Sequence, residues 1–117
     1  MFFRAYGLLI RSDFDLSPLG VECVAPPSSR NIDLRISVDE DDSQSLAFVD
    51  NQTCVDVFSG YYFREEMALY RFFSGKEIKV LVLAKSIDVD FLRVLMNYPI
   101  ACVMFQRGYF ALHASAV

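Results

Sequence analysis

The acidic run at residues 39–42 is the densest group of potential metal ligands in the sequence. A calcium loop requires alternating oxygen ligands, a glycine at the sharp turn and a distal glutamate, and the run lacks this arrangement. We therefore expect an exposed, solvated turn. Two other carboxylate pairs, Glu65-Glu66 and Asp88/Asp90, have the residue types for acid–base catalysis. We expect structural roles for both, because neighbours in a strand point to opposite faces and Asp88 stands where a helix cap belongs.

Nucleophilic and zinc chemistry would depend on three cysteines, Cys23, Cys54 and Cys102, and on one histidine, His113. A cysteine nucleophile needs a base that is itself oriented by a third side chain, and no signature of this kind surrounds these residues. A zinc site needs more soft ligands, commonly in close pairs. The odd number and wide spacing of the cysteines favour reduced, buried thiols in a cytoplasmic protein.

The two common phosphate-binding loops are absent from the sequence, which contains neither Gly-x-x-x-x-Gly-Lys-Ser/Thr nor Gly-x-Gly-x-x-Gly. Each of these loops turns backbone N–H groups at the start of a helix toward phosphate oxygens. We therefore expect that the chain binds no nucleotide and holds no cofactor of its own. Calorimetry with ATP and magnesium is expected to show no binding.

An aromatic run beside an arginine is the candidate partner surface of the sequence. Tyrosine and arginine are enriched among the residues that anchor interfaces, so the run indicates contact with a peptide or protein. Aromatic residues make up 15% of the chain, and core packing is the more frequent explanation for such a run. The residues of this candidate surface are Phe58, Tyr61, Tyr62, Phe63 and Arg64.

Composition bounds the remaining possibilities. The 117 residues are 54% hydrophobic and 22% charged, which suits one domain with one core. The net charge is −4, and Lys and Arg are scattered along the sequence, so nucleic acid is not an expected partner. The first residues do not resemble a secretory signal, and no apolar stretch approaches the roughly 20 residues of a membrane span. A soluble, cytoplasmic protein is expected.

Hydrophobic periodicity predicts the elements that must position these residues. Residues 32–38 alternate apolar and polar side chains, which makes them the clearest strand. Residues 67–73 and 77–84 form a hairpin around Gly75, and Pro99 divides the helical segment in two. The first helix is capped by Ser86 or Asp88. Strands are expected at 2–10, 21–25, 32–38, 46–49, 54–58, 67–73, 77–84 and 109–117, and helices at 88–96 and 99–106.

The expected fold is therefore α+β. It consists mainly of an antiparallel β-meander or sheet, followed by two short C-terminal helices and a final strand. The hairpin arms 46–49 and 54–58 continue the meander, and the strand at 77–84 is central or covered by a helix, because both of its faces are apolar. The irregular segment between 11 and 31 joins the first strand to the rest.

The segment 105–117, Phe-Gln-Arg-Gly-Tyr-Phe-Ala-Leu-His-Ala-Ser-Ala-Val, resembles a stretch of kinases related to HPr kinase/phosphorylase. In that family a short helix ends in Arg-Gly, a strand carries Leu-His-Ala-Ser-Ala-Val, and the Walker A loop begins a few residues later. The resemblance implies that residues 1–117 are a single, non-catalytic N-terminal domain of a longer serine kinase. His113 and Ser115 would then lie at the junction with the kinase core.

The family resemblance also implies the partners of the parent protein. A downstream kinase core would bind ATP and magnesium and phosphorylate a serine in a peptide or protein, and some short relatives accompany lasso-peptide biosynthesis genes. Because the chain ends within the expected strand 109–117, we expect a longer protein and, for the isolated chain, a homodimer through Tyr109–Val117. The alternative is a freestanding peptide- or protein-binding module without catalytic activity.

Overall fold

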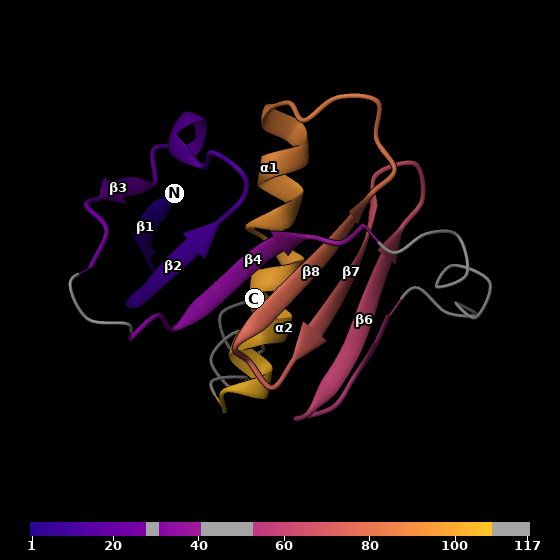
Figure 1. The fold of residues 1–117 in the computed structure, drawn as a ribbon. Helices are drawn as coiled ribbons and strands as arrows, with labels where there is room; N and C mark the ends of the chain where they lie inside the picture. Colours follow the sequence, from indigo (N-terminus) through magenta and orange to yellow (C-terminus); the bar gives the residue numbers. More distant parts are fainter. Residues whose placement is uncertain (28–30, 41–52, 109–117) are drawn as a thin grey trace, which may run out of the picture.

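The computed structural model describes residues 1–27, 31–40 and 53–108, with Thr53 and Cys54 described as backbone only. These residues form strands, a 3-10 helix and two α-helices (Figure 1). The strands are β1 (Phe2–Ala5), β2 (Leu8–Ser12), β3 (Glu22–Val24), β4 (Leu34–Val38), β5 (Thr53–Val55), β6 (Ser59–Arg64), β7 (Ala68–Phe73) and β8 (Glu77–Val82). The helices are η1 (Ser17–Leu19), α1 (Val89–Leu95) and α2 (Tyr98–Gln106).

The eight strands form one sheet in the order β3-β1-β2-β4-β8-β7-β6-β5. Most neighbours are antiparallel, and β7 and β8 form the expected hairpin. β6 pairs with β7 and was not predicted as a strand, whereas the strand predicted at 54–58 ends at Val55. The expected α+β fold class is therefore confirmed. Two pairings differ from a meander, because β4 lies parallel to both β2 and β8. In the described part of the chain, no helix is long and apolar enough to cross a membrane.

The first predicted strand, 2–10, is instead a hairpin. β1 and β2 pair in antiparallel register, and the turn between them contains Tyr6 at φ 54° and Gly7 at φ 75°. Positive φ at both central positions matches the twist of a hairpin. Tyrosine seldom adopts this conformation, so the turn carries no sequence signal at its first position. The Tyr6 hydroxyl donates a hydrogen bond to the Met96 carbonyl oxygen at 3.2 Å, which ties the turn to the helices.

Two aspartates hold the parallel β2–β4 pair at its ends. Asp33 accepts a hydrogen bond from the Leu9 amide at 2.8 Å, while its own amide donates to the Leu9 carbonyl at 2.9 Å. Asp13 accepts from the Val38 amide at 2.9 Å and donates its amide to the Ile36 carbonyl at 2.9 Å. The side chains therefore satisfy backbone groups that the short strands leave unpaired.

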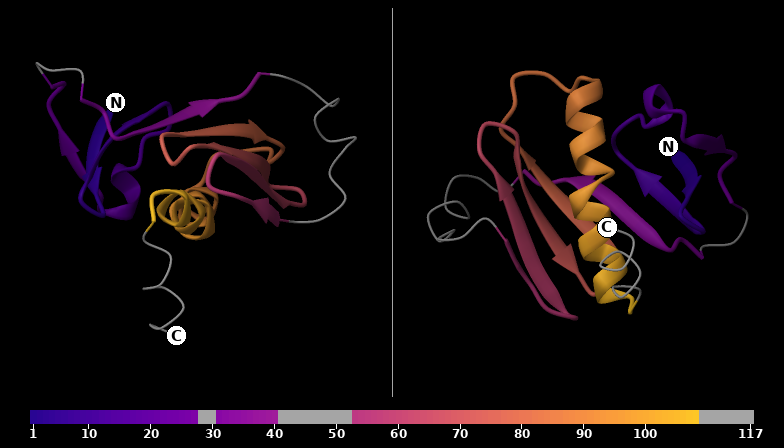
Figure 2. Two further views of the ribbon diagram at one scale, coloured as in Figure 1. Left: turned by 90° about the horizontal axis from the view of Figure 1, so that it is seen from below. Right: turned by 180° about the vertical axis from the view of Figure 1, so that it is seen from behind.

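The helical segment follows the prediction closely. Asp88 is the N-cap of α1, and its carboxylate accepts a hydrogen bond from the Phe91 amide at 2.9 Å. Pro99 lies in the first turn of α2, where its missing N–H breaks no helical hydrogen bond. Figure 2 shows both helices on the same side of the sheet.

The core lies between this face of the sheet and the helices. The alternation predicted for 32–38 is confirmed at the centre of β4, where Leu34 and Ile36 are fully buried and Arg35 is exposed. The strand begins only at Leu34, and Val38, expected on the buried face, is 44% exposed. The strand at 77–84 is central, as expected. The main core residues of the sheet are Phe3, Ile10, Leu34, Ile36, Tyr70, Phe72, Ile78 and Val80, and those of the helices are Phe91, Leu92, Leu95, Ile100 and Val103.

The C-terminal end of α2 is fastened to the turn between β7 and β8. The Gln106 side chain accepts from the Gly75 amide at 2.8 Å and donates to the Asp56 carbonyl at 2.9 Å. The Arg107 guanidinium donates to the carbonyl oxygens of Gly75 at 2.9 Å and Asp33 at 3.2 Å. The expected strand 109–117, with His113 and Ser115, lies outside the described residues, as does the expected hairpin arm 46–49.

Candidate binding surface

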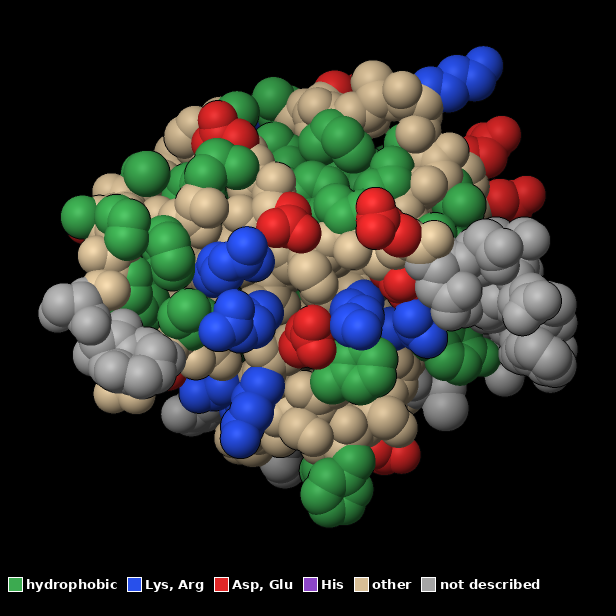
Figure 3. Space-filling view, in the orientation of Figure 1, with side chains coloured by type: hydrophobic (Ala, Val, Ile, Leu, Met, Phe, Trp, Pro, Cys, Tyr) green, Lys and Arg blue, Asp and Glu red, His purple; other side chains and the backbone are tan. Residues whose placement is uncertain are grey.

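The sheet has one face that α1 and α2 do not cover. Figure 1 is drawn from this side, with the helices behind the strands. Side chains alternate along each strand, so residues that flank the core positions point to this open face. The space-filling view in Figure 3 shows Lys and Arg side chains gathered across its middle, with acidic and hydrophobic side chains among them.

Strand register identifies five of these cations, which we call the cationic band. Arg11 on β2 and Arg35 on β4 are direct cross-strand neighbours. Lys79 on β8 and Arg71 on β7 are also paired, one row further along the sheet. Lys and Arg are scattered along the sequence, but the sheet brings several of them together on one face, which was not expected from the sequence. The cationic band consists of Arg4, Arg11, Arg35, Arg71 and Lys79.

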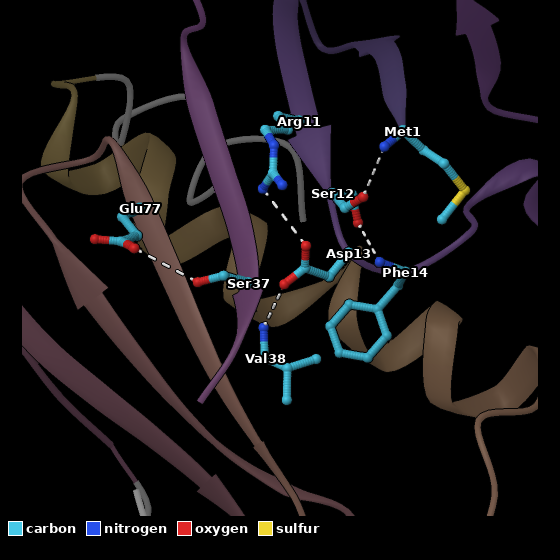
Figure 4. Close-up of polar contacts among 8 residues, drawn as sticks. All are labelled: Met1, Arg11, Ser12, Asp13, Phe14, Ser37, Val38 and Glu77. Atoms are coloured by element: carbon cyan, nitrogen blue, oxygen red, sulfur yellow. Dashed lines mark hydrogen bonds and ion pairs between the residues drawn. The ribbon is translucent and has the colours of Figure 1, made fainter. Parts of the chain in front are cut away.

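Carboxylates on the open face form ion pairs with only some of the cations of the band. Figure 4 shows Asp13 between two strands, with one oxygen 3.4 Å from the Arg11 guanidinium and the other on the Val38 amide. Glu77 accepts a long hydrogen bond of 3.5 Å from the Ser37 hydroxyl. Arg35 lies opposite Glu77 in register, yet these two side chains form no ion pair. Arg35 is thus an exposed charged side chain on a central strand, with N–H groups that remain free to donate hydrogen bonds.

The acidic run at 39–42 was expected to be an exposed turn, but its first residue, Asp39, is buried. The residue is only 9% exposed, and its carboxylate accepts two hydrogen bonds from Arg71, the one from Nε at 3.1 Å. Both hydrogen bonds end on Oδ2 of Asp39, and such charge-assisted contacts are stronger than hydrogen bonds between neutral groups. Glu40 is exposed as expected, and the rest of the acidic run lies outside the described residues. Asp39 therefore fixes the position of Arg71 within the cationic band.

A shallow cleft of about 380 Å³ borders the cationic band at the β6–β7 end. Phe73 forms its apolar wall, and the cations of Arg71 and Lys79 lie 5.9 and 5.7 Å from the ring centroid. Asp56 lies at the opposite rim, where the amides of Ser59 and Phe58 donate to its carboxylate and lower its pKa below the usual range. The lining of the cleft therefore combines one guanidinium, aromatic rings and one carboxylate.

The predicted aromatic surface is divided by the sheet. Tyr61 and Phe63 have their side chains on the open face, whereas Tyr62 and Arg64 lie on the helix side. Phe58 precedes β6 in a turn and is 75% exposed. Alternation along β6 accounts for this separation, since neighbouring side chains of a strand point in opposite directions. The five residues therefore contribute to two different surfaces.

The other chemical candidates occupy structural positions. Glu65 and Glu66 are exposed in the turn between β6 and β7, where Glu66 has φ 64°. Cys23 is exposed, which differs from the expectation of a buried thiol. Cys102 is buried, and burial raises the pKa of its thiol to about 12, so it remains neutral and weakly nucleophilic at ordinary pH. Residues 1–27, 31–40 and 53–108 contain no group of three potential metal ligands.

The sequence pattern missed the cationic band because its members come from five strands and from opposite halves of the chain. The available signal was the polar half of each alternating strand, for example Arg35 between Leu34 and Ile36. Chemically, the surface is suited to binding an anionic, extended ligand through charge and hydrogen bonds. Comparison of the chain with protein-family models, curated proteins and solved structures found no match in any of the three.

Proposed function

We propose that residues 1–117 form the N-terminal, non-catalytic domain of a cytoplasmic, ATP-dependent serine kinase related to HPr kinase/phosphorylase. In this proposal the domain binds an acidic, extended segment of the peptide or protein substrate and presents it to a kinase core downstream. The core supplies the sites for ATP and magnesium. Lasso-peptide biosynthesis is the proposed setting, since short relatives of this kind accompany such genes.

The cationic band is the observation that carries the binding role. Its charges come from strands, so they stand on a rigid support, and Arg71 is further fixed by Asp39. The chain has a net charge of −4, yet this face presents several cations together. A concentration of one charge on an oppositely charged protein favours a partner that is recognised by charge.

An acidic peptide suits the band better than nucleic acid does. Carboxylates of the protein, including Asp13 and Glu77, lie among the cations and would repel a continuous phosphate backbone. A peptide with separated carboxylates can place each of them beside a guanidinium, and Phe73 offers contact to an apolar side chain.

Charge reversal of Arg35 tests this role. A fluorescent peptide of Glu and Ser is titrated with the protein at low salt, and binding is followed by anisotropy. Arg35→Glu is expected to weaken binding by at least about fivefold, because it replaces an unpaired cation with a repulsive charge. The matched control is Lys85→Glu, which makes the same change in net charge at an exposed residue between β8 and α1.

Equal weakening by Arg35→Glu and Lys85→Glu would mean that only net charge matters and would remove the band from the proposal. A single-stranded oligonucleotide that binds more tightly than the peptide would instead assign the surface to nucleic acid. Thermal unfolding of both variants establishes that the folded proteins are compared.

The kinase setting is carried by the resemblance of residues 105–117 and is tested separately. The coding sequence is read beyond Val117, where a Walker A loop is expected within some tens of residues. A frame without such a loop would reject the kinase setting and leave the peptide-binding result untouched.

A freestanding peptide- or protein-binding module is the second candidate function. The cationic band and the cleft beside Phe73 favour it independently of the C-terminal resemblance, because they belong entirely to described residues. This candidate predicts the same peptide titration and a natural stop codon after Val117. The two experiments together therefore separate the two candidates.

A further inference from the structure

A second polar cleft, of about 230 Å³, lies on the helix side of the sheet, where β6 meets the junction of α1 and α2. We call it the junction cleft. One arginine comes from the end of β6 and the other from α1, so two elements contribute cations to a single space. The cleft is lined by Tyr62, Arg64, Arg93, Val94, Asn97 and Tyr98.

The junction cleft has more cationic than anionic groups. Arg64 is exposed and forms no ion pair with any residue of the described ranges. Arg93 is 3.2 Å from Asp90, but both side chains are largely exposed, so this surface pair is weak. The Asn97 side chain makes no capping hydrogen bond to α2 and is free to donate. Two guanidiniums that face one cleft repel each other until an anion joins them.

Two tyrosine rings, Tyr62 and Tyr98, line the junction cleft. Tyr62 lies between Tyr98, with ring centroids 4.6 Å apart, and Tyr70, stacked at 5.7 Å. Tyr70 is fully buried, and its hydroxyl has no hydrogen-bond partner among the described residues. Burial raises the pKa of this phenol, Tyr62 raises it further and the charge of Arg64 lowers it. Tyr70 is not among the residues that line the junction cleft, so its hydroxyl has no role in the proposed site.

We propose that the junction cleft binds the phosphate group of a phosphate monoester. Arg64 and Arg93 approach it from opposite elements, Asn97 donates from the rim, and the Tyr62 and Tyr98 rings contact the organic part of the ligand. This site is distinct from the cationic band, which lies on the opposite face of the sheet, and it does not depend on the proposed kinase setting.

Phosphate fits the junction cleft better than a carboxylate does. A phosphate monoester carries close to two negative charges and three strong acceptor oxygens, so it can accept from both guanidiniums at once. Arginine also matches phosphate geometry through two parallel N–H donors. A single carboxylate has one charge and two oxygens and would leave one arginine without a partner.

Nuclear magnetic resonance titration with phosphoserine tests the proposal on the whole chain. The largest shifts are expected at Asn97, Tyr98 and the Arg64 side chain. Arg64→Ala and Arg93→Ala are each expected to weaken binding by about tenfold or more, since each removes charge-assisted hydrogen bonds. Asp90→Asn is expected to strengthen binding, because it releases Arg93 from its ion pair with Asp90.

Lys76→Ala removes a cation from an exposed residue in the turn between β7 and β8, outside both proposed sites, and is the matched control that is expected to leave phosphoserine binding unchanged. Acetate is titrated beside phosphoserine, inorganic phosphate and phosphotyrosine. Acetate binding as tight as phosphoserine binding would overturn the assignment of a phosphate. Equal losses from Lys76→Ala and Arg64→Ala, or shifts confined to the open face, would overturn the assignment of the cleft.

Discussion

Leu34→Asp is expected to prevent the domain from folding, whereas Arg35→Asp is expected to leave a cooperative thermal transition. The two residues are adjacent in β4, and Leu34 is fully buried between β2 and β8 while Arg35 is exposed on the open face. Circular dichroism during heating compares the two variants directly. Aspartate is introduced in both variants, so the comparison shows how a carboxylate is tolerated at a buried and at an exposed position of the same strand.

The expected difference is large compared with the stability of a domain. Removing the leucine side chain from the core costs about 1.5–3 kcal/mol of burial. Burying a carboxylate without a partner adds several kcal/mol more. Domains of this size are stable by only about 5–15 kcal/mol. At Arg35, the new carboxylate faces Glu77 but also lies beside Arg11, and the net cost is expected to stay within about 1 kcal/mol.

A folded Leu34→Asp variant, with a transition close to that of the unchanged protein, would contradict the position of β4 at the centre of the sheet. Similar destabilisation by both substitutions would indicate that β4 is covered on both faces. Leu34→Ala provides an intermediate step, since it removes packing without adding charge and is expected to cost about 2–5 kcal/mol.

Local patterns predicted most of the elements because each carries its own signal. The alternation around Leu34 and Ile36, Gly75 between two apolar runs, and Pro99 after an apolar helix all give the correct structure from neighbours in sequence. The hairpin turn at Tyr6 was not predicted. Positive φ at a tyrosine depends on the surrounding structure, here on the hydrogen bond to Met96, and leaves no signal in the sequence. Parallel pairing of β4 also has no local signal, since it joins strands that are far apart in the chain.

The candidate sites could be predicted only in part, because they too depend on which distant parts of the chain the fold brings together. The run from Phe58 to Arg64 was predicted as a single partner surface, but strand alternation divides its residues between two faces. The cationic band and the junction cleft each combine residues from separate elements, as Arg64 and Arg93 show. Charge at a surface therefore depends on topology, which composition and spacing do not specify.

Gly75→Ala is expected to destabilise the domain by roughly 2–4 kcal/mol, measured by urea denaturation. The backbone at Gly75 has φ 68°, a left-handed conformation that disfavours any side chain. A Cβ atom there would also lie 2.6 Å from Cγ of Arg107, too close for two carbon atoms. Arg107 would have to move, and its hydrogen bonds to the carbonyl oxygens of Gly75 and Asp33 would be lost.

Gly20→Ala separates the cost of backbone strain from the cost of the steric contact with Arg107. Gly20 has φ 80°, but no atom lies within 4 Å of a Cβ placed there, so this variant reports backbone strain alone. It is expected to cost roughly 1–2 kcal/mol. The excess at Gly75 measures the contact between the β7–β8 turn and the end of α2, and it should largely disappear when Gly75→Ala is made in an Arg107→Ala background. An equal cost at Gly20 and Gly75, or an excess that persists without the Arg107 side chain, would show that this arginine does not join α2 to the sheet.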